Sequence, residues 1–273
     1  MNGIDEVIVG IDGTPAGDAA VSWAADEAAS RAARLRIVYV RSDEPVAGSY
    51  VERVAQATRA RHTGLPVTAE VVAGGATEVL TRLARDAELT VVGCHERTAL
   101  AEALHGATGT RVAMRAPGPI AVVRGRPDAE GPVVVGVDGS HHDNRLLAVA
   151  FEFAARRGAE VVALRVLAPP AAPWGIGIPP LVPNATQGRA NLLHDLTDDV
   201  QRWHDKYPTV PATARVPGGD PAGVLLDASG EARLLVLGGR PHGPASALLA
   251  DSVGHRLLYH AACPLLFVHT PVV

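Results

Sequence analysis

Short apolar runs alternate along the chain with longer segments in which apolar residues recur at helical spacing. In the first half, the apolar runs are Glu6–Ile11, 34–40, 67–72 and Leu89–Gly93. The segments of helical spacing are 15–33, 49–62, 77–87 and 108–115. Short buried strands that alternate with helices are joined by right-handed crossovers, so this order predicts an α/β fold with a parallel, doubly wound sheet.

The chain also repeats itself. The run VIVGIDGT at residues 7–14 returns as VVVGVDGS at residues 133–140, an offset of 126. Two later runs, at 89–93 and 119–123, return as 234–238 and 264–268, an offset of 145. The second half therefore carries 19 additional residues, which we place in a proline-rich insertion at about 168–186. A repeat at this period predicts two similar domains, 1–124 and 132–273, joined by a polar linker at 125–131 and each with its own five-stranded sheet.

Composition and charge narrow the class of protein. Hydrophobic residues make up 47% of the chain and charged residues 20%, which is typical of a globular protein. The net charge of −4 argues against binding to nucleic acid or to an anionic membrane surface. Cys94 and Cys263 are far apart and form no paired motif. With no signal sequence at the N-terminus and no run long enough to span a bilayer, we expect a cytoplasmic protein.

The candidate chemistry lies where the first and fourth strands of each domain end. In an open α/β sheet, ligands bind beyond the carboxyl ends of the strands, at the point where strand order reverses. This places Asp12 and Gly93 together in domain one, and Asp138 and Gly238 together in domain two. Each aspartate precedes a glycine, so a simple turn after a strand is the alternative interpretation.

These motifs resemble those of the universal stress protein family in its tandem, two-domain bacterial form. The resemblance rests on Val-Gly-x-Asp-Gly-Ser/Thr at the end of the first strand and on a fourth strand that ends in glycine. It rests also on a final Cys-Pro-apolar strand, CPLLFV at 263–268. It implies two Rossmann-like, adenine nucleotide alpha-hydrolase-like domains, each a five-stranded parallel sheet with helices on both faces. It also implies pairing of the two fifth strands within the chain, whereas a further homodimer is left open.

The family's ligand is ATP or a related adenine nucleotide, with Mg²⁺ as a further candidate. In the family, the aspartate serves the adenine end, and a loop of pattern Gly-x2-Gly-x9-Gly-Ser/Thr wraps the ribose and phosphates. The matching positions in domain one are Gly10, Asp12, Gly93, Glu96, Arg97, Gly106, Ala107 and Thr108. The matching positions in domain two are Gly136, Asp138, Gly238, Arg240, Gly243, Asp251, Ser252 and Val253.

Both phosphate loops depart from that pattern. Glu96 and Ala107 replace a glycine and a hydroxyl residue in domain one, and Pro241 and Asp251 replace two glycines in domain two. A carboxylate about 4 Å from a phosphate costs roughly 4 kcal/mol at an effective dielectric constant near 20. Proline removes a backbone N–H donor from the anion cradle. We therefore predict degenerate sites that bind nucleotide weakly.

Other interpretations of single residues stay open. Asp251 and Ser252 together are also typical of a helix N-cap. Cys94 could be a nucleophile, although a buried or loop cysteine is the more common role. The histidine pairs at 141/142 and 255/260 do not have the spacing of metal ligands on one helix face. We therefore predict no catalytic residue and no metal site.

Three functions are compatible with this sequence. The first is a stress-response regulatory protein that holds an adenine nucleotide and at most hydrolyses it slowly. The second is an interaction scaffold of the same family that no longer binds nucleotide. The third, an enzyme on a related α/β fold, has least support because no phosphate-binding GxxxxGK or GxGxxG loop follows a strand.

Overall fold

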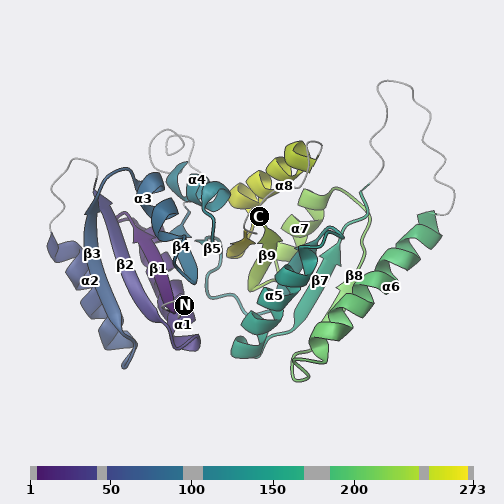
Figure 1. Cartoon of the computed structure of the whole chain (residues 1–273), viewed down its shortest axis with the longest axis horizontal. Coiled ribbons are helices and arrows are strands. Elements are labelled where there is room, and N and C mark those ends of the chain that lie inside the picture. The colour runs from purple at the N-terminus through teal and green to yellow at the C-terminus, as the bar shows by residue number, and fades with distance from the viewer. Residues whose placement is uncertain (1–4, 42–47, 95–106, 169–184, 240–245, 270–273) are drawn as a thin grey trace.

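The computed structural model describes residues 5–41, 48–94, 107–168, 185–239 and 246–269 (Figure 1). Domain one contains β1 (Glu6–Ile11), α1 (Pro15–Ser30), β2 (Arg34–Arg41), α2 (Gly48–Arg61), β3 (Val67–Ala73), α3 (Ala76–Leu83), β4 (Leu89–Gly93), α4 (Ala107–Arg115) and β5 (Ile120–Val123). Domain two contains β6 (Val133–Val137), α5 (Asp143–Arg157), β7 (Val161–Arg165), α6 (Ala185–His204), β8 (Ala212–Arg215), α7 (Pro221–Ser229), β9 (Leu234–Gly238), α8 (Ser246–His260) and β10 (Leu265–Val268).

The elements of the first half agree with the hydrophobic pattern to within a few residues. The strands β1 and β4 have the predicted bounds. Helix α1 ends at Ser30, before the predicted end at residue 33, because Ala32 adopts a left-handed backbone conformation with φ +54°. A residue in that conformation cannot continue a right-handed helix.

The ten strands form one sheet in the order β3-β2-β1-β4-β5-β10-β9-β6-β7-β8. Neighbouring strands run parallel within each domain, and strand order reverses between β1 and β4 and between β6 and β9. β5 and β10 pair antiparallel, with Ala121 opposite Leu266. The repeat alone predicts two separate sheets, and in this respect the prediction is wrong. Both fifth strands are apolar edges, and their pairing removes two open edges at once.

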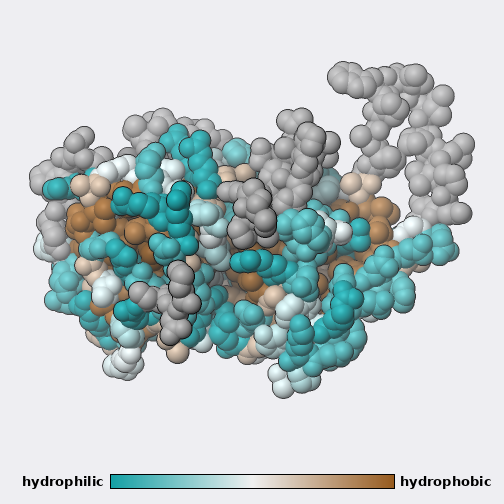
Figure 2. All heavy atoms as spheres, viewed as in Figure 1, coloured by the Kyte–Doolittle hydropathy of each residue, from teal (hydrophilic) through white to brown (hydrophobic). Residues whose placement is uncertain are grey.

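Helices cover both faces of the sheet. One buried apolar layer lies between the sheet and α1, α2, α5 and α6, and the other lies between the sheet and α3, α4, α7 and α8. Figure 1 shows the two domains on either side of the central seam, and Figure 2 shows the hydrophilic surface of α6 at the lower right. No helix among the described residues is both long and apolar enough to cross a membrane.

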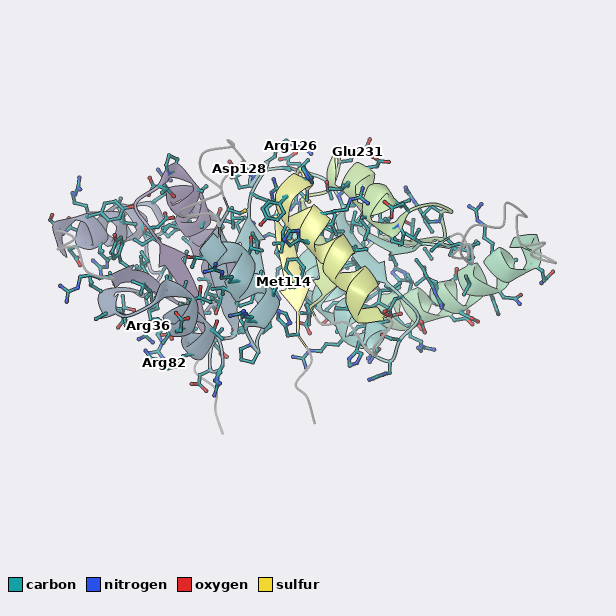
Figure 3. All side chains as sticks on the ribbon, turned by 90° about the horizontal axis from the view of Figure 1, so that it is seen from above. Arg36, Arg82, Met114, Arg126, Asp128 and Glu231 are labelled. Atoms are coloured by element: carbon teal, nitrogen blue, oxygen red, sulfur yellow. The ribbon has the colours of Figure 1, made fainter. Side chains whose placement is uncertain are left out.

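The domains hold each other by equivalent contacts at the seam. Arg124 follows β5 and donates from Nη1 to the carbonyl oxygen of Leu257 on α8, at 3.0 Å. His269 follows β10, and its Nε2 lies 2.7 Å from the carbonyl oxygen of Ala113 on α4. The linker residue Arg126 donates to the carbonyl oxygen of Gly230. Figure 3 labels Arg126 and Glu231, the residue after Gly230, at its upper edge. Each domain thus anchors the last helix of the other.

Candidate functional site

The turn after β1 holds an aspartate at the carboxyl edge of the sheet. Asp12 is exposed, and its Oδ1 accepts hydrogen bonds from the backbone N–H of Thr14 (3.1 Å) and from the Thr14 hydroxyl (2.5 Å). Gly13 has φ +82°, a conformation that favours glycine. Thr14 is the N-cap of α1, because its Oγ1 accepts from Gly17 N at 3.2 Å. The turn therefore fixes the position of the Asp12 carboxylate and leaves it open to solvent.

The end of β4 packs closely against this turn. A Cβ atom at Gly93 would collide with the carbonyl oxygen of Ala16 in the first turn of α1. On the other side, a Cβ atom at Gly109 of α4 would lie 3.0 Å from the carbonyl oxygen of Gly93. Glycine is required where two backbones approach in this way. Asp12 and Gly93 therefore lie at the same strand-order reversal, as the sequence predicts.

Two tyrosines stand beside the domain-one turn. Tyr39 is in β2 and Tyr50 in α2, and their rings meet edge to face with centroids 6.4 Å apart. Tyr50 Cε1 lies 4.0 Å from the Cβ position of Gly13, and its hydroxyl donates to Asp18 Oδ1 at 3.2 Å. Burial, together with the Asp18 carboxylate, raises the pKa of Tyr50 to about 12. The two rings form an aromatic wall beside the turn. Aromatic side chains of this kind can stack on the face of a purine base.

The turn after β6 in domain two is built differently. Gly139 has φ +88°, and Asp138 Oδ1 accepts from Ser140 N at 2.9 Å, as in domain one. However, α5 begins at Asp143, whose buried carboxylate accepts from Asp138 N (3.2 Å) and Gly139 N (2.7 Å). The guanidinium of Arg165, at the end of β7, lies directly against Gly139. In domain two, the charged residues Asp143 and Arg165 thus stand beside the turn in place of the aromatic wall of domain one.

Burial raises the pKa of the Asp143 carboxyl to about 6. The backbone N–H groups of Gly139 and Asp138 oppose this shift, the nearby Asp138 carboxylate adds to it, and the Arg165 guanidinium opposes it. The balance keeps Asp143 charged at neutral pH and makes its charge sensitive to mild acid.

A profile of the universal stress protein family matches residues 3–124 and 131–269, which is nearly the whole chain. The chain belongs to the universal stress protein family. A universal stress protein of Mycolicibacterium smegmatis is 31% identical over 289 aligned positions, covering 96% of each chain. One from Mycobacterium tuberculosis is 30% identical and covers 95% of each chain.

Solved structures support the fold of this universal stress protein. A universal stress protein from Archaeoglobus fulgidus superimposes with a TM-score of 0.71 at 13% sequence identity. The alignment covers 98% of this chain and 99% of that one. At this identity the similarity shows the tandem α/β fold and nothing about the ligand.

The structure describes part of the predicted phosphate loops of this universal stress protein. Ala107 and Thr108 begin α4, and Gly238 ends β9. Asp251, Ser252 and Val253 lie within α8. The remaining predicted loop residues are outside the described residues: Glu96, Arg97, Gly106, Arg240 and Gly243.

The interpretation of Asp251 and Ser252 as a helix N-cap is wrong. Helix α8 begins at Ser246, so both residues stand in its interior. The intervening segment 247–250 reads Ala-Leu-Leu-Ala, and these are strong helix formers that extend the helix toward its N-terminus.

The remaining candidates of the sequence lie away from the site or are chemically unsuited. Cys94 follows β4, and its Sγ lies 3.7 Å from the carbonyl oxygen of Leu258. Burial raises the pKa of the Cys94 thiol, which lowers its fraction of reactive thiolate. Cys263 is fully buried. Among the residues that the structure describes, no three His, Cys, Asp or Glu side chains are arranged to hold a metal ion.

Sequence reasoning missed Tyr39, Tyr50, Asp143 and Arg165. Tyr39 and Arg165 could have been found from the sheet register, because each stands at the carboxyl end of the strand next to the first strand of its domain. Asp143 could have been found by aligning the two repeats, because it places a charge where the first repeat has Gly17. Tyr50 reaches the turn only because α2 packs beside α1, and no local pattern reports that contact.

Proposed function

We propose that this universal stress protein is a regulatory protein that binds an adenine nucleotide weakly at the carboxyl edge of its sheet. The observation that carries the proposal is the exposed Asp12 carboxylate, held by Thr14 at the strand-order reversal beside Tyr50. A carboxylate can accept hydrogen bonds from ribose hydroxyls or from the adenine amino group. Tyr39 and Tyr50 offer an aromatic surface for the base.

The residues of the phosphate loop explain why binding should be weak. The aspartate and the aromatic wall serve the nucleoside, whereas the phosphates depend on the loop that follows β4. In that loop, Glu96 adds a negative charge, and Ala107 lacks the hydroxyl group of the family pattern. The expected ligand is therefore recognised mainly by its nucleoside, and Mg²⁺ would enter only with the phosphates.

The proposed role is regulatory rather than enzymatic. Phosphoryl chemistry relies on positioning of the phosphates and on electrostatic stabilisation of the developing charge. The replacements at Glu96, Pro241 and Asp251 remove donors or add negative charge where the family pattern places the phosphates. They also favour the second candidate, an interaction scaffold that no longer binds nucleotide.

Location and assembly are part of the same proposal. Neither Cys94 nor Cys263 forms a disulfide, which suits a reducing cytoplasm. Because β5 and β10 already pair within the chain, a homodimer would have to use other surfaces, such as the outer strands β3 and β8.

Isothermal titration with adenosine and with ATP tests this proposal. We expect both ligands to bind the unmodified protein in the micromolar to millimolar range. Asp12→Ala should weaken both at least tenfold, because it removes the carboxylate that the two ligands share. Asp128→Ala, an exposed change in the linker with the same loss of charge, is the matched control and should have no effect.

The double variant Glu96→Gly, Asp251→Gly should strengthen ATP binding much more than adenosine binding, because only ATP carries the repelled phosphates. Submicromolar ATP binding by the unmodified protein would show that the loop is competent as it stands. Absence of binding by both ligands would reject nucleotide binding and favour the scaffold. Mass spectrometry of small molecules released from protein purified without added nucleotide gives an independent check.

A further inference from the structure

The two strand-end turns differ in whether the chain itself supplies an anion. In domain two, the Asp143 carboxylate accepts hydrogen bonds from two successive backbone N–H groups, those of Asp138 and Gly139. Successive N–H groups after a strand are the usual cradle for a bound anion. The equivalent of Asp143 in domain one is Gly17, which has no side chain to fill that position.

A second difference lies on the neighbouring strand. Val137 of β6 is in register with Arg165 of β7, as Ile11 of β1 is with Tyr39 of β2. Domain two therefore has an arginine where domain one has a tyrosine. The Arg165 guanidinium lies against Gly139 and interacts electrostatically with Asp143. The Arg165 guanidinium thus covers the turn, and the Asp143 carboxylate accepts hydrogen bonds from its backbone N–H groups.

The first turn of the helix differs accordingly. Helix α1 starts at Pro15, whereas α5 starts at Asp143, two residues later in the repeat. In domain one the helix start packs so closely on β4 that Gly93 has no room for a Cβ atom. In domain two the Cβ position of Gly238 lies 3.8 Å from the nearest side-chain atom, Leu146 Cδ1. Asp143, which contacts the turn, is therefore the first residue of a helix that begins later in the repeat than α1 does.

We propose that Asp143 and Arg165 close the strand-end turn of domain two from within, so that domain one is the ligand-accepting domain of the pair. The identity of the ligand, an adenine nucleotide whose nucleoside lies at this turn, rests on the proposed function above. The closure of domain two does not, because it depends only on contacts within the chain.

Closure of this kind should weaken in mild acid. The groups that face the Asp143 carboxylate are the N–H groups of Asp138 and Gly139, the Asp138 carboxylate and the Arg165 guanidinium. Protonation of Asp143 removes the charge that both N–H groups and the guanidinium stabilise. The raised pKa of about 6 places this event within reach of a titration on the folded protein.

The test uses backbone amide resonances of Gly13 and Gly139 in the full-length, isotope-labelled protein. ATP is added to the unmodified protein, to Asp143→Gly, which copies domain one, and to Gly17→Asp, which copies domain two. We expect ATP to shift Gly13 but not Gly139 in the unmodified protein. In Asp143→Gly it should shift both, with at least a tenfold gain in apparent affinity at Gly139. Gly17→Asp should abolish the response of Gly13, and Asp143→Gly alone decides the closure if this charged variant does not fold.

A titration without ligand provides the second readout. The Gly139 amide should follow a transition near pH 6 in the unmodified protein and lose it in Asp143→Gly, with Asp128→Gly as the matched control. A Gly139 amide that responds to ATP in the unmodified protein, or that shows no transition, overturns the closure.

The two proposals fail separately. If ATP shifts neither glycine in the unmodified protein, nucleotide binding by domain one is wrong. In that case a response of Gly139 in Asp143→Gly still supports closure, and the ligand-free titration of the Gly139 amide decides it if neither variant responds.

Discussion

The carboxylate of Glu27 in domain one is bonded to the guanidinium of Arg157 in domain two, with Oε2 and Nη2 3.1 Å apart. Glu27 is fully buried, and its Oε1 also contacts Arg31 Nε at 2.6 Å and Arg156 Nη2 at 3.1 Å. Arg31 and Arg157 are equivalent residues of the repeat, at the offset of 126. One buried acid on α1 thus joins the start of domain two to domain one, away from the strand seam.

Replacement of this acid should destabilise the whole chain. Glu27→Gln leaves three guanidinium groups without their shared carboxylate, and removal of one partner of a buried ion pair costs about 3–5 kcal/mol. The arginines keep partial solvent access, so we expect a value near the lower end. Urea denaturation measures the loss. Glu52→Gln, which breaks an exposed pair with Arg59, is the control and should cost less than about 1 kcal/mol.

The same acid should make stability depend on pH. Burial alone would raise the pKa of Glu27, but Arg31, Arg156 and Arg157 together hold it below its ordinary value of 4.5. A depressed folded pKa gives stability that is present above pH 4.5 and lost as pH falls through the folded pKa. Denaturation midpoints should therefore fall below that pH and should fall less steeply in Glu27→Gln. Parallel curves for the two proteins would contradict this assignment.

Two equivalent glycines should respond differently to the same substitution. Gly93→Ala forces a Cβ atom into the carbonyl oxygen of Ala16, and overpacking of this kind costs about 1–3 kcal/mol. Gly238→Ala has room for its Cβ atom and should change the free energy of unfolding by no more than about 0.5 kcal/mol. Equal losses in the two variants would show that the close approach at β4 is absent in solution.

Tyr50 should ionise only at strongly alkaline pH. Burial and the Asp18 carboxylate raise its pKa to about 12, so absorbance at alkaline pH should show one late transition that Tyr50→Phe removes. Because the folded pKa is raised, this contribution to stability is complete below pH 10.0 and is lost as pH rises toward 12. An alkaline titration that Tyr50→Phe leaves unchanged in its late part would contradict the contact with Asp18.

The two thiols should react slowly in the native state. Burial raises the pKa of Cys94 and raises that of Cys263 to about 12, so little thiolate is present at pH 8. Alkylation by iodoacetamide, followed by mass spectrometry, should modify neither residue at the rate of a free thiol, and should modify both after unfolding in urea. Rapid modification of Cys94 would revive its interpretation as a nucleophile.

Local patterns were sufficient to predict the repeating units of this protein. Apolar runs ended by Asp-Gly predicted β1 and β6, and the offsets of 126 and 145 predicted two domains with one insertion. These signals are local because strand burial and turn chemistry depend on a few consecutive residues. The same signals predicted that Asp12 and Gly93 meet, since parallel strands bring their carboxyl ends to one edge.

The tertiary structure decided which distant groups meet. The pairing of β5 with β10 makes one sheet from two; the family resemblance implies this pairing, but the apolar pattern of each strand does not specify its partner. Asp143 could equally have faced solvent, and before α1 and α5 were placed together the only partner of Glu27 visible in the sequence was Arg31, four residues later. The free energy of such contacts depends on burial and on geometry between segments far apart in the chain. The sequence by itself therefore determined the two strand-end turns and the residues that differ between them, and only the packing decided which of those residues contact each turn.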